Sequence, residues 1–236
     1  AVLDGRIYYP PDFDPGATYP VIVYYYGGTS PVTVDFGGRY PKNVWAGQDY
    51  IIYVPQPSGA TGYGQEFAAR HVNDWGQRTA WEVVEATKAF LEAHPFADAE
   101  HVGCIGASYG GFLTQYILTQ TDLFAASVAG AALTNFFSMF GTIHWNQGMP
   151  EVAHFETGQA RMEVPYWEDM EAYARNSPVI HITELDTPML LFFGDSDGVV
   201  DWHQGVEMYN YARRAGKFLV MLVYPGENHS AARKEN

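Results

Sequence analysis

Ser108 lies in the segment Gly106-Ala107-Ser108-Tyr109-Gly110, which has the pattern G-x-S-x-G. This pattern places a serine on a sharp turn between a strand and a helix, with its hydroxyl directed out of the sheet. The flanking sequence fits such a turn, because residues 102–105 are apolar like a buried strand and residues 112–118 predict a helix with an apolar face. A serine on this turn becomes a nucleophile once a neighbouring base removes its proton. We therefore expect Ser108 to carry out acyl transfer, rather than to be a bystander in a glycine-rich turn.

His229 is the base that we expect to activate Ser108. It follows the apolar run 218–225, which predicts a late strand of the chain. A histidine at this place would accept the proton of the serine hydroxyl and return it to the leaving group. The working residues of a parallel sheet lie in loops at the carboxyl ends of strands, so the loop after the run 188–194 should supply the acid. The chain order serine, acid, histidine is the order found in an α/β-hydrolase.

Three aspartates in that loop could supply the acid: Asp195, Asp197 and Asp201. The acid would fix the tautomer of the His229 imidazole and stabilise its positive form. Asp197 is our choice and Asp195 is the second choice.

The negative oxygen of a tetrahedral intermediate also needs hydrogen-bond donors. One donor should be the backbone N–H of Tyr109, the residue after the nucleophile. The other should come from the end of the apolar run 21–28, which closes with three tyrosines and two glycines. We expect the phenol of Tyr26, or a backbone N–H of one of the two glycines, to be this second donor.

The elements that must position these residues alternate along the chain, which predicts a doubly wound, mostly parallel sheet with helices on both faces. Because most of the apolar runs show no alternation, we expect strands that are buried on both sides. The expected strands cover residues 5–11, 21–28, 50–55, 102–105, 125–131, 188–194 and 218–225, and the expected helices cover residues 43–46, 79–94, 112–118 and 202–215.

Composition excludes several classes of protein. A chain of 236 residues with 47 % hydrophobic residues can form one α/β domain with a sizeable core. A net charge of −14 and the lack of any lysine or arginine cluster exclude a nucleic-acid partner. No apolar run approaches the about 20 residues of a membrane span. The single cysteine, Cys104, falls in an expected buried strand and should be a small core residue.

Neither a metal nor another cofactor is expected. The chain has no H-x-x-x-H or H-E-x-x-H motif and no cysteine pair. Most of the remaining histidines should have surface or packing roles, although His144 and His154 could approach the site from above. Both belong to residues 135–171, a segment rich in Phe, Met, Trp and His that has no strand pattern and interrupts the alternation.

The chain resembles the catalytic domain of the prolyl oligopeptidase family of serine peptidases, which includes dipeptidyl peptidases and acylaminoacyl peptidases. The tyrosine and the second glycine that follow the serine are more specific to this family than G-x-S-x-G alone. The resemblance covers nearly the whole length, through the connector 12–19, Tyr26-Gly27-Gly28, the loop 58–64, Asp74-Trp75-Gly76, the segment 106–111, Gly194-x-x-Asp197-x-x-Val200 and Glu227-Asn228-His229.

By this resemblance Ser108, Asp197 and His229 form the catalytic triad, and the hydroxyl of Tyr26 with the N–H of Tyr109 forms the oxyanion hole. An apolar, medium-sized specificity pocket should be lined by Tyr109, Phe136, Met139 and Val200. Such a pocket suits proline or another uncharged side chain, because none of these four residues is an acid that could pair with lysine or arginine.

The resemblance also implies a longer protein. We expect residues 1–236 to be one catalytic domain, a fragment without the N-terminal β-propeller and the closing C-terminal helix of the family. Dimers are common in this family, so a homo-oligomer is a further expectation. The sequence favours neither a cytoplasmic nor a periplasmic location.

The function that we expect is hydrolysis of short peptides through an acyl-enzyme. An esterase or another acyl hydrolase is the alternative, because neither the fold nor the triad determines the acyl group. A catalytically silent binding module on the same fold is the third reading, and the complete triad argues against it.

Overall fold

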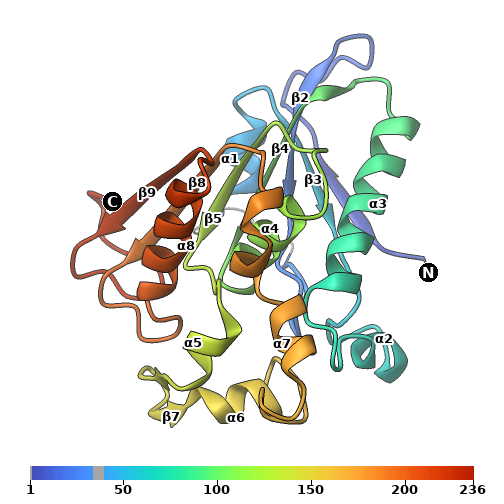
Figure 1. The fold of residues 1–236 in the computed structure, drawn as a ribbon. Helices are drawn as coiled ribbons and strands as arrows, with labels where there is room; N and C mark the ends of the chain where they lie inside the picture. The colour runs from blue at the N-terminus through green and yellow to red at the C-terminus, as the bar shows by residue number, and fades with distance from the viewer. Residues whose placement is uncertain (1, 34–39) are drawn as a thin grey trace.

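A computed structural model of the chain describes residues 2–33 and 40–236. Its centre is a sheet of seven strands in the order β1-β3-β2-β4-β5-β8-β9, in which β1 is antiparallel to β3 and every other pair is parallel (Figure 1). The doubly wound, mostly parallel sheet is as predicted. The strands are β1 (Gly5–Tyr8), β2 (Tyr19–Tyr24), β3 (Ile51–Pro55), β4 (Ala97–Ala107), β5 (Ala126–Gly130), β8 (Met189–Gly194) and β9 (Leu219–Tyr224).

The four predicted helices are present as α1, α3, α4 and α8, and the described residues add the short helices α2, α5, α6 and α7 and a 3-10 helix, η1. Helix α4 begins at Tyr109, three residues before the apolar face that predicted it, because the turn at Ser108 leads directly into the helix. The helical elements are α1 (Lys42–Ala46), α2 (Gln65–Ala69), α3 (Gln77–Ala93), α4 (Tyr109–Leu118), α5 (Phe136–Phe140), α6 (Glu151–Glu156), α7 (Met170–Arg175), η1 (Pro178–Glu184) and α8 (His203–Arg214).

Alternate residues of the strands face two different cores. Val21 and Val23 of β2 belong to the main core, which also contains apolar side chains of α3, α4 and α8. Ile22 and Tyr24 of the same strand face a smaller cluster that includes Ala46 of α1. Helices therefore lie on both faces of the sheet, and the central strands are buried on both sides, as their continuous apolar runs predicted.

The segment after β5 folds into short elements at one end of the sheet (Figure 1). Contrary to the expectation that it has no strands, two of its dipeptides pair as a small antiparallel hairpin, β6 (Ile143–His144) and β7 (Met149–Pro150). Two-residue strands are too short to give an alternating pattern, which explains why the sequence did not show them. Among the described residues, no helix is both long enough and apolar enough to cross a membrane.

Aromatic side chains attach this segment to the rest of the domain. Phe136 of α5 is fully buried, and its ring centroid lies 4.8 Å from that of Trp75 and 5.3 Å from that of Phe155 on α6. Phe155 in turn stacks on Tyr173 of α7. Such offset and edge-to-face contacts stabilise a core beyond simple burial of area. These ring contacts hold the segment in place at the carboxyl ends of the strands.

Replacing Phe136 by alanine should lower the free energy of unfolding by about 3–5 kcal/mol, because it leaves a cavity among fully buried rings. Urea denaturation followed by tryptophan fluorescence measures this change. The control is Phe218→Ala, whose side chain is 68 % exposed and which should change stability by less than about 0.5 kcal/mol. A loss below about 1 kcal/mol for Phe136→Ala would contradict the packing role.

Candidate active site

Ser108 occupies the turn between β4 and α4 with φ +58° and ψ −121°, a conformation that is rare for a residue with a side chain. The glycines of the motif make the turn possible. A Cβ atom on Gly106 would lie 2.3 Å from the carbonyl oxygen of Gly110, and one on Gly110 would lie 2.7 Å from that of Tyr25. The backbone thus passes too closely for any other residue, as a nucleophile turn requires.

His229 lies in the loop after β9, with its Nδ1 atom 2.9 Å from Oδ2 and 3.0 Å from Oδ1 of Asp197. The Asp197 carboxylate is fully buried, and its Oδ1 atom accepts hydrogen bonds from the backbone N–H groups of Val199 and Val200. These donors satisfy the buried charge and orient the carboxylate towards the imidazole. With Nδ1–H donated to Asp197, the Nε2 atom of His229 is the nitrogen available to a serine hydroxyl.

The other two aspartates of the same loop have different partners. Asp195, the second choice for the acid, accepts a hydrogen bond of 2.6 Å from the backbone N–H of Gly226. Asp201 lies 2.7 Å from the Nδ1 atom of His203 at the surface. The structure therefore places Asp197 beside His229 and gives Asp195 a role in joining two loops.

Asn228, the residue before His229, connects three loops. Its Oδ1 atom accepts from the backbone N–H of Gly198 at 3.0 Å and from that of His229 at 2.6 Å. Its amide also exchanges two hydrogen bonds of 3.0 Å with the amide of Asn146, between β6 and β7. The sequence predicts no role for Asn228, although the residue belongs to the motif Glu227-Asn228-His229. Asn228 is thus a positioning residue for the histidine loop.

The two residues expected to supply the oxyanion donors, Tyr26 and Tyr109, line the same cavity. Tyr109 is the first residue of α4, so its backbone N–H has no acceptor within the helix. Tyr26 borders the same cavity as Ser108, and its ring centroid lies 6.1 Å from that of Tyr109. Gly27 has φ +79°, and a Cβ atom there would lie 2.7 Å from the Tyr109 ring. The glycine therefore allows the loop after β2 to lie against the start of α4.

The Tyr109 phenol is buried and serves packing. Its hydroxyl donates to the carbonyl of Trp75, and burial raises the pKa of Tyr109 well above its usual value. Its ring lies beside His71, whose pKa is lowered to about 3 by burial and then by the nearby Arg161. His71 is consequently neutral at physiological pH, which agrees with the packing role expected for it.

Ser108 and His229 line one cavity of about 280 Å³. Tyr109, Met139 and Val200 line it as predicted, but Phe136 does not, because it is buried behind the wall in the aromatic cluster. The cavity has two sides of different character. One is apolar and includes Trp75, Phe112, Leu133, Met139, Val199 and Val200, and the other is polar and includes His144, Gln147, Glu151, His154 and Gln159.

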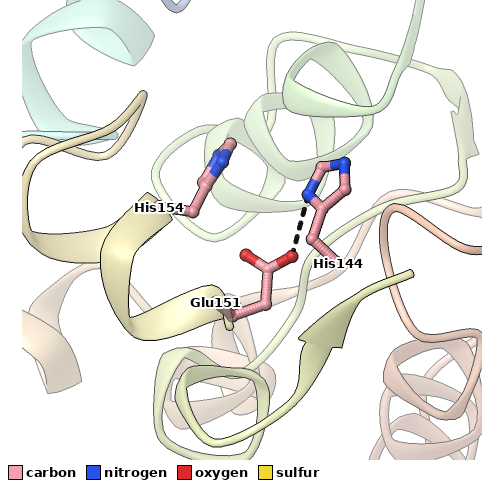
Figure 2. Close-up of side chains that lie close together, drawn as sticks. All are labelled: His144, Glu151 and His154. Carbon is pink, nitrogen blue, oxygen red and sulfur yellow. Dashed lines mark ion pairs between the residues drawn. The ribbon is translucent and has the colours of Figure 1, made fainter. Parts of the chain in front are cut away.

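His144, Glu151 and His154 form a cluster on the polar side, in which one potential metal-ligand atom from each residue lies within 4.8 Å of the others (Figure 2). None of the metal-binding motifs sought in the sequence marks this cluster, and Glu151 adds an acid to the cavity wall, outside the four residues expected to line the specificity pocket. Both histidines reach the site, as their position in the segment 135–171 allowed. The signal in the sequence was Glu151-x-x-His154, since residues three apart share one face of a helix.

Burial dominates the electrostatics of this cluster. It raises the pKa of the Glu151 carboxyl to about 7, and it lowers the pKa of the His154 imidazole. The pKa of His144 is also lowered, first by burial and then by the nearby His229. The charge of His229 therefore acts on His144 within one cavity.

Comparison with known proteins relates this chain to one family. The sequence model of the prolyl oligopeptidase family matches residues 39–236. The chain is 29 % identical over 235 residues to dipeptidyl-peptidase 5 of Porphyromonas gingivalis, covering 96 % of this chain and 33 % of that protein. It is 27 % identical over 234 residues to the uncharacterized peptidase YuxL of Bacillus subtilis, covering 98 % of this chain and 34 % of that protein. The chain thus spans about a third of the length of these relatives.

Solved structures agree with this result. The acylaminoacyl peptidase of Pyrococcus horikoshii superposes with a TM-score of 0.84 at 25 % identity, over 96 % of this chain and 35 % of that one. Dipeptidyl peptidase 4 of Porphyromonas gingivalis gives a TM-score of 0.85 at 22 % identity, over 99 % of this chain and 31 % of that one, which supports the fold. The predicted α/β-hydrolase fold is confirmed.

Replacing Asn228 by alanine should lower kcat by about 10-fold to 100-fold in an assay of acyl hydrolysis, because it frees the loop that positions His229. The measurement is steady-state kinetics together with thermal unfolding. Asn146→Ala, which removes the two amide-to-amide hydrogen bonds but keeps those from Gly198 and His229, is the matched control and should have a smaller effect. Unchanged kcat in a folded Asn228→Ala variant would show that the loop is positioned by other contacts.

Proposed function

We propose, since this chain belongs to the prolyl oligopeptidase family of serine peptidases, that it hydrolyses short peptides through an acyl-enzyme. The observation that carries this proposal is the joint placement of three groups. Ser108 lies on a strained turn in the cavity that His229 also lines, and His229 is hydrogen-bonded to the buried Asp197. A nucleophile, a base and a residue that orients the base are the parts that acyl transfer requires.

The reaction follows from these positions. The Oγ atom of Ser108 attacks the scissile carbonyl while Nε2 of His229 takes its proton, and Asp197 stabilises the imidazolium that forms. The Tyr109 N–H and the Tyr26 hydroxyl stabilise the oxyanion. His229 then protonates the leaving amine, and a water molecule, activated by the same imidazole, hydrolyses the acyl-enzyme.

We further propose that the apolar side of the cavity accepts an uncharged side chain of the substrate. Met139 and Val200 border it, and burial of apolar surface favours such a group by roughly 25 cal/mol per Å². Since the relatives are about three times as long as this chain, we propose that residues 1–236 are the catalytic domain of a longer protein with an N-terminal β-propeller.

Replacing Ser108 by alanine should reduce kcat by on the order of 10⁶, because the triad acts as a unit. The same variant should lose labelling by a fluorophosphonate probe, whereas mass spectrometry of the wild-type protein should find the probe on Ser108. Peptide p-nitroanilides and activated esters are the substrates to compare. Hydrolysis of esters alone would replace the peptidase with an esterase, and the absence of labelling would indicate a silent module.

Replacing Tyr26 by phenylalanine should reduce kcat about 10²-fold, with little change in KM, if the phenol donates to the oxyanion in the transition state. Steady-state kinetics on the same p-nitroanilide measures both constants. Tyr24→Phe, two residues earlier and in the smaller core, is the matched control and should leave kcat within threefold. A change below threefold for Tyr26→Phe would assign the donor role to a backbone N–H of the following glycines.

A further inference from the structure

The cluster of His144, Glu151 and His154 has side chains from two neighbouring elements that converge on the wall of the active-site cavity (Figure 2). His144 comes from β6, and the other two come from α6, where they are three residues apart. The pattern Glu-x-x-His on one face of a helix is a ligand pair that metal-binding helices use. His144, on the hairpin of β6 and β7, supplies the second imidazole.

Two buried atoms in the cluster have no hydrogen bond. The Nδ1 atom of His144 and the Oε1 atom of Glu151 face each other at 3.0 Å, in side chains that are only 6 % and 2 % exposed. Neither atom has a correctly aligned hydrogen-bond partner among the described residues. The dashed line in Figure 2 marks this contact as an ion pair, in which the imidazole is charged only when it is protonated. A buried carboxylate that lacks a charged or hydrogen-bonding partner is costly, and native proteins usually satisfy such groups or pair them with a cation.

The types of the three ligand atoms indicate which cation the cluster would bind. Two imidazole nitrogens and one carboxylate oxygen are the ligands of open, three-residue zinc sites, whereas calcium and magnesium prefer oxygen alone. Zinc ligands lie about 2.0–2.2 Å from the ion. Atoms within 4.8 Å of one another therefore need only small side-chain rotations to share one ion.

We propose that His144, Glu151 and His154 form a binding site for one Zn²⁺ ion, and that the bound ion inhibits the enzyme. The three ligands leave a fourth position of the ion open to the cavity that Ser108 and His229 line. An ion and its water at that wall would occupy part of the roughly 280 Å³ available to the substrate. Its positive charge would also oppose formation of the His229 imidazolium during catalysis.

The binding part of the proposal is tested without any activity assay. The full-length protein is stripped of metal with a chelator, dialysed and titrated with Zn²⁺ by calorimetry, and the visible absorption of Co²⁺ in the same site reports tetrahedral coordination. We expect one ion per chain. His144→Gln, Glu151→Gln and His154→Gln should each weaken binding by at least about 100-fold, since even a residue that only orients a ligand costs 10-fold to 100-fold.

Matched controls exclude binding by surface histidines. His101 pairs with Asp98 and His203 pairs with Asp201, and both imidazoles are largely exposed. His101→Gln and His203→Gln should leave the zinc affinity unchanged. Thermal unfolding checks that each variant is folded, and His154→Gln, at a half-buried position, is the decisive variant if the more buried ones unfold. Wild-type protein that binds no zinc, or a folded His154→Gln variant with unchanged affinity, would overturn the site.

The inhibitory part rests on the proposed peptidase function, and its readout is separate. Zinc should lower hydrolysis of a peptide p-nitroanilide in proportion to the occupancy found by calorimetry, and EDTA should restore it. Zinc bound at full occupancy with unchanged turnover would overturn inhibition but keep the site. Zinc binding by a protein that hydrolyses no peptide would keep the site and refute the proposed function instead.

Discussion

The close approach of three backbone segments around Ser108 is the constraint on which the site depends. Gly106, Gly110 and the strand end at Tyr25 lie so near one another that Cβ atoms on the glycines would collide with carbonyl groups. Within this contact Ser108 is held at a positive φ, which costs on the order of 1–3 kcal/mol and persists only when the surroundings impose it. The parallel strands on either side of β4 supply those surroundings, since β2 and β5 both pair with it.

The other two residues of the proposed triad, Asp197 and His229, lie in loops that are joined to one another. The loop after β8 contains Asp197, and the loop after β9 contains His229. Because β8 and β9 are neighbouring parallel strands, both loops emerge at the same edge of the sheet. Asn228 and Asp195 bridge these two loops by hydrogen bonds to backbone groups. The position of His229 therefore depends on contacts with several elements and not only on its own loop.

The segment between β5 and η1 gives the cavity its polar side. Its aromatic rings pack into the main core, where Phe136 and Phe155 fix α5 and α6. Because α6 is thereby fixed, Glu151 and His154 are placed beside the base although the chain has no local reason to bury them. Two of these buried polar atoms, His144 Nδ1 and Glu151 Oε1, lack an aligned hydrogen bond, which is costly to stability.

From the sequence alone, the sheet, four of its helices and the candidate residues Ser108 and His229 could be predicted. Long apolar runs and the G-x-S-x-G motif depend on local periodicity and turn chemistry, which act over a few residues. The sequence offered Asp195, Asp197 and Asp201 as candidates for the acid, because a sequence pattern does not show in which direction the side chains of one loop point.

The three-dimensional structure places Asp197 beside His229, buries Phe136 in the core instead of the pocket, and brings His144 next to Glu151 and His154. These outcomes depend on contacts between residues far apart in the chain, or on the exact course of a loop. Side-chain direction in such regions is set by packing against distant elements, and no pattern of nearby residues encodes it.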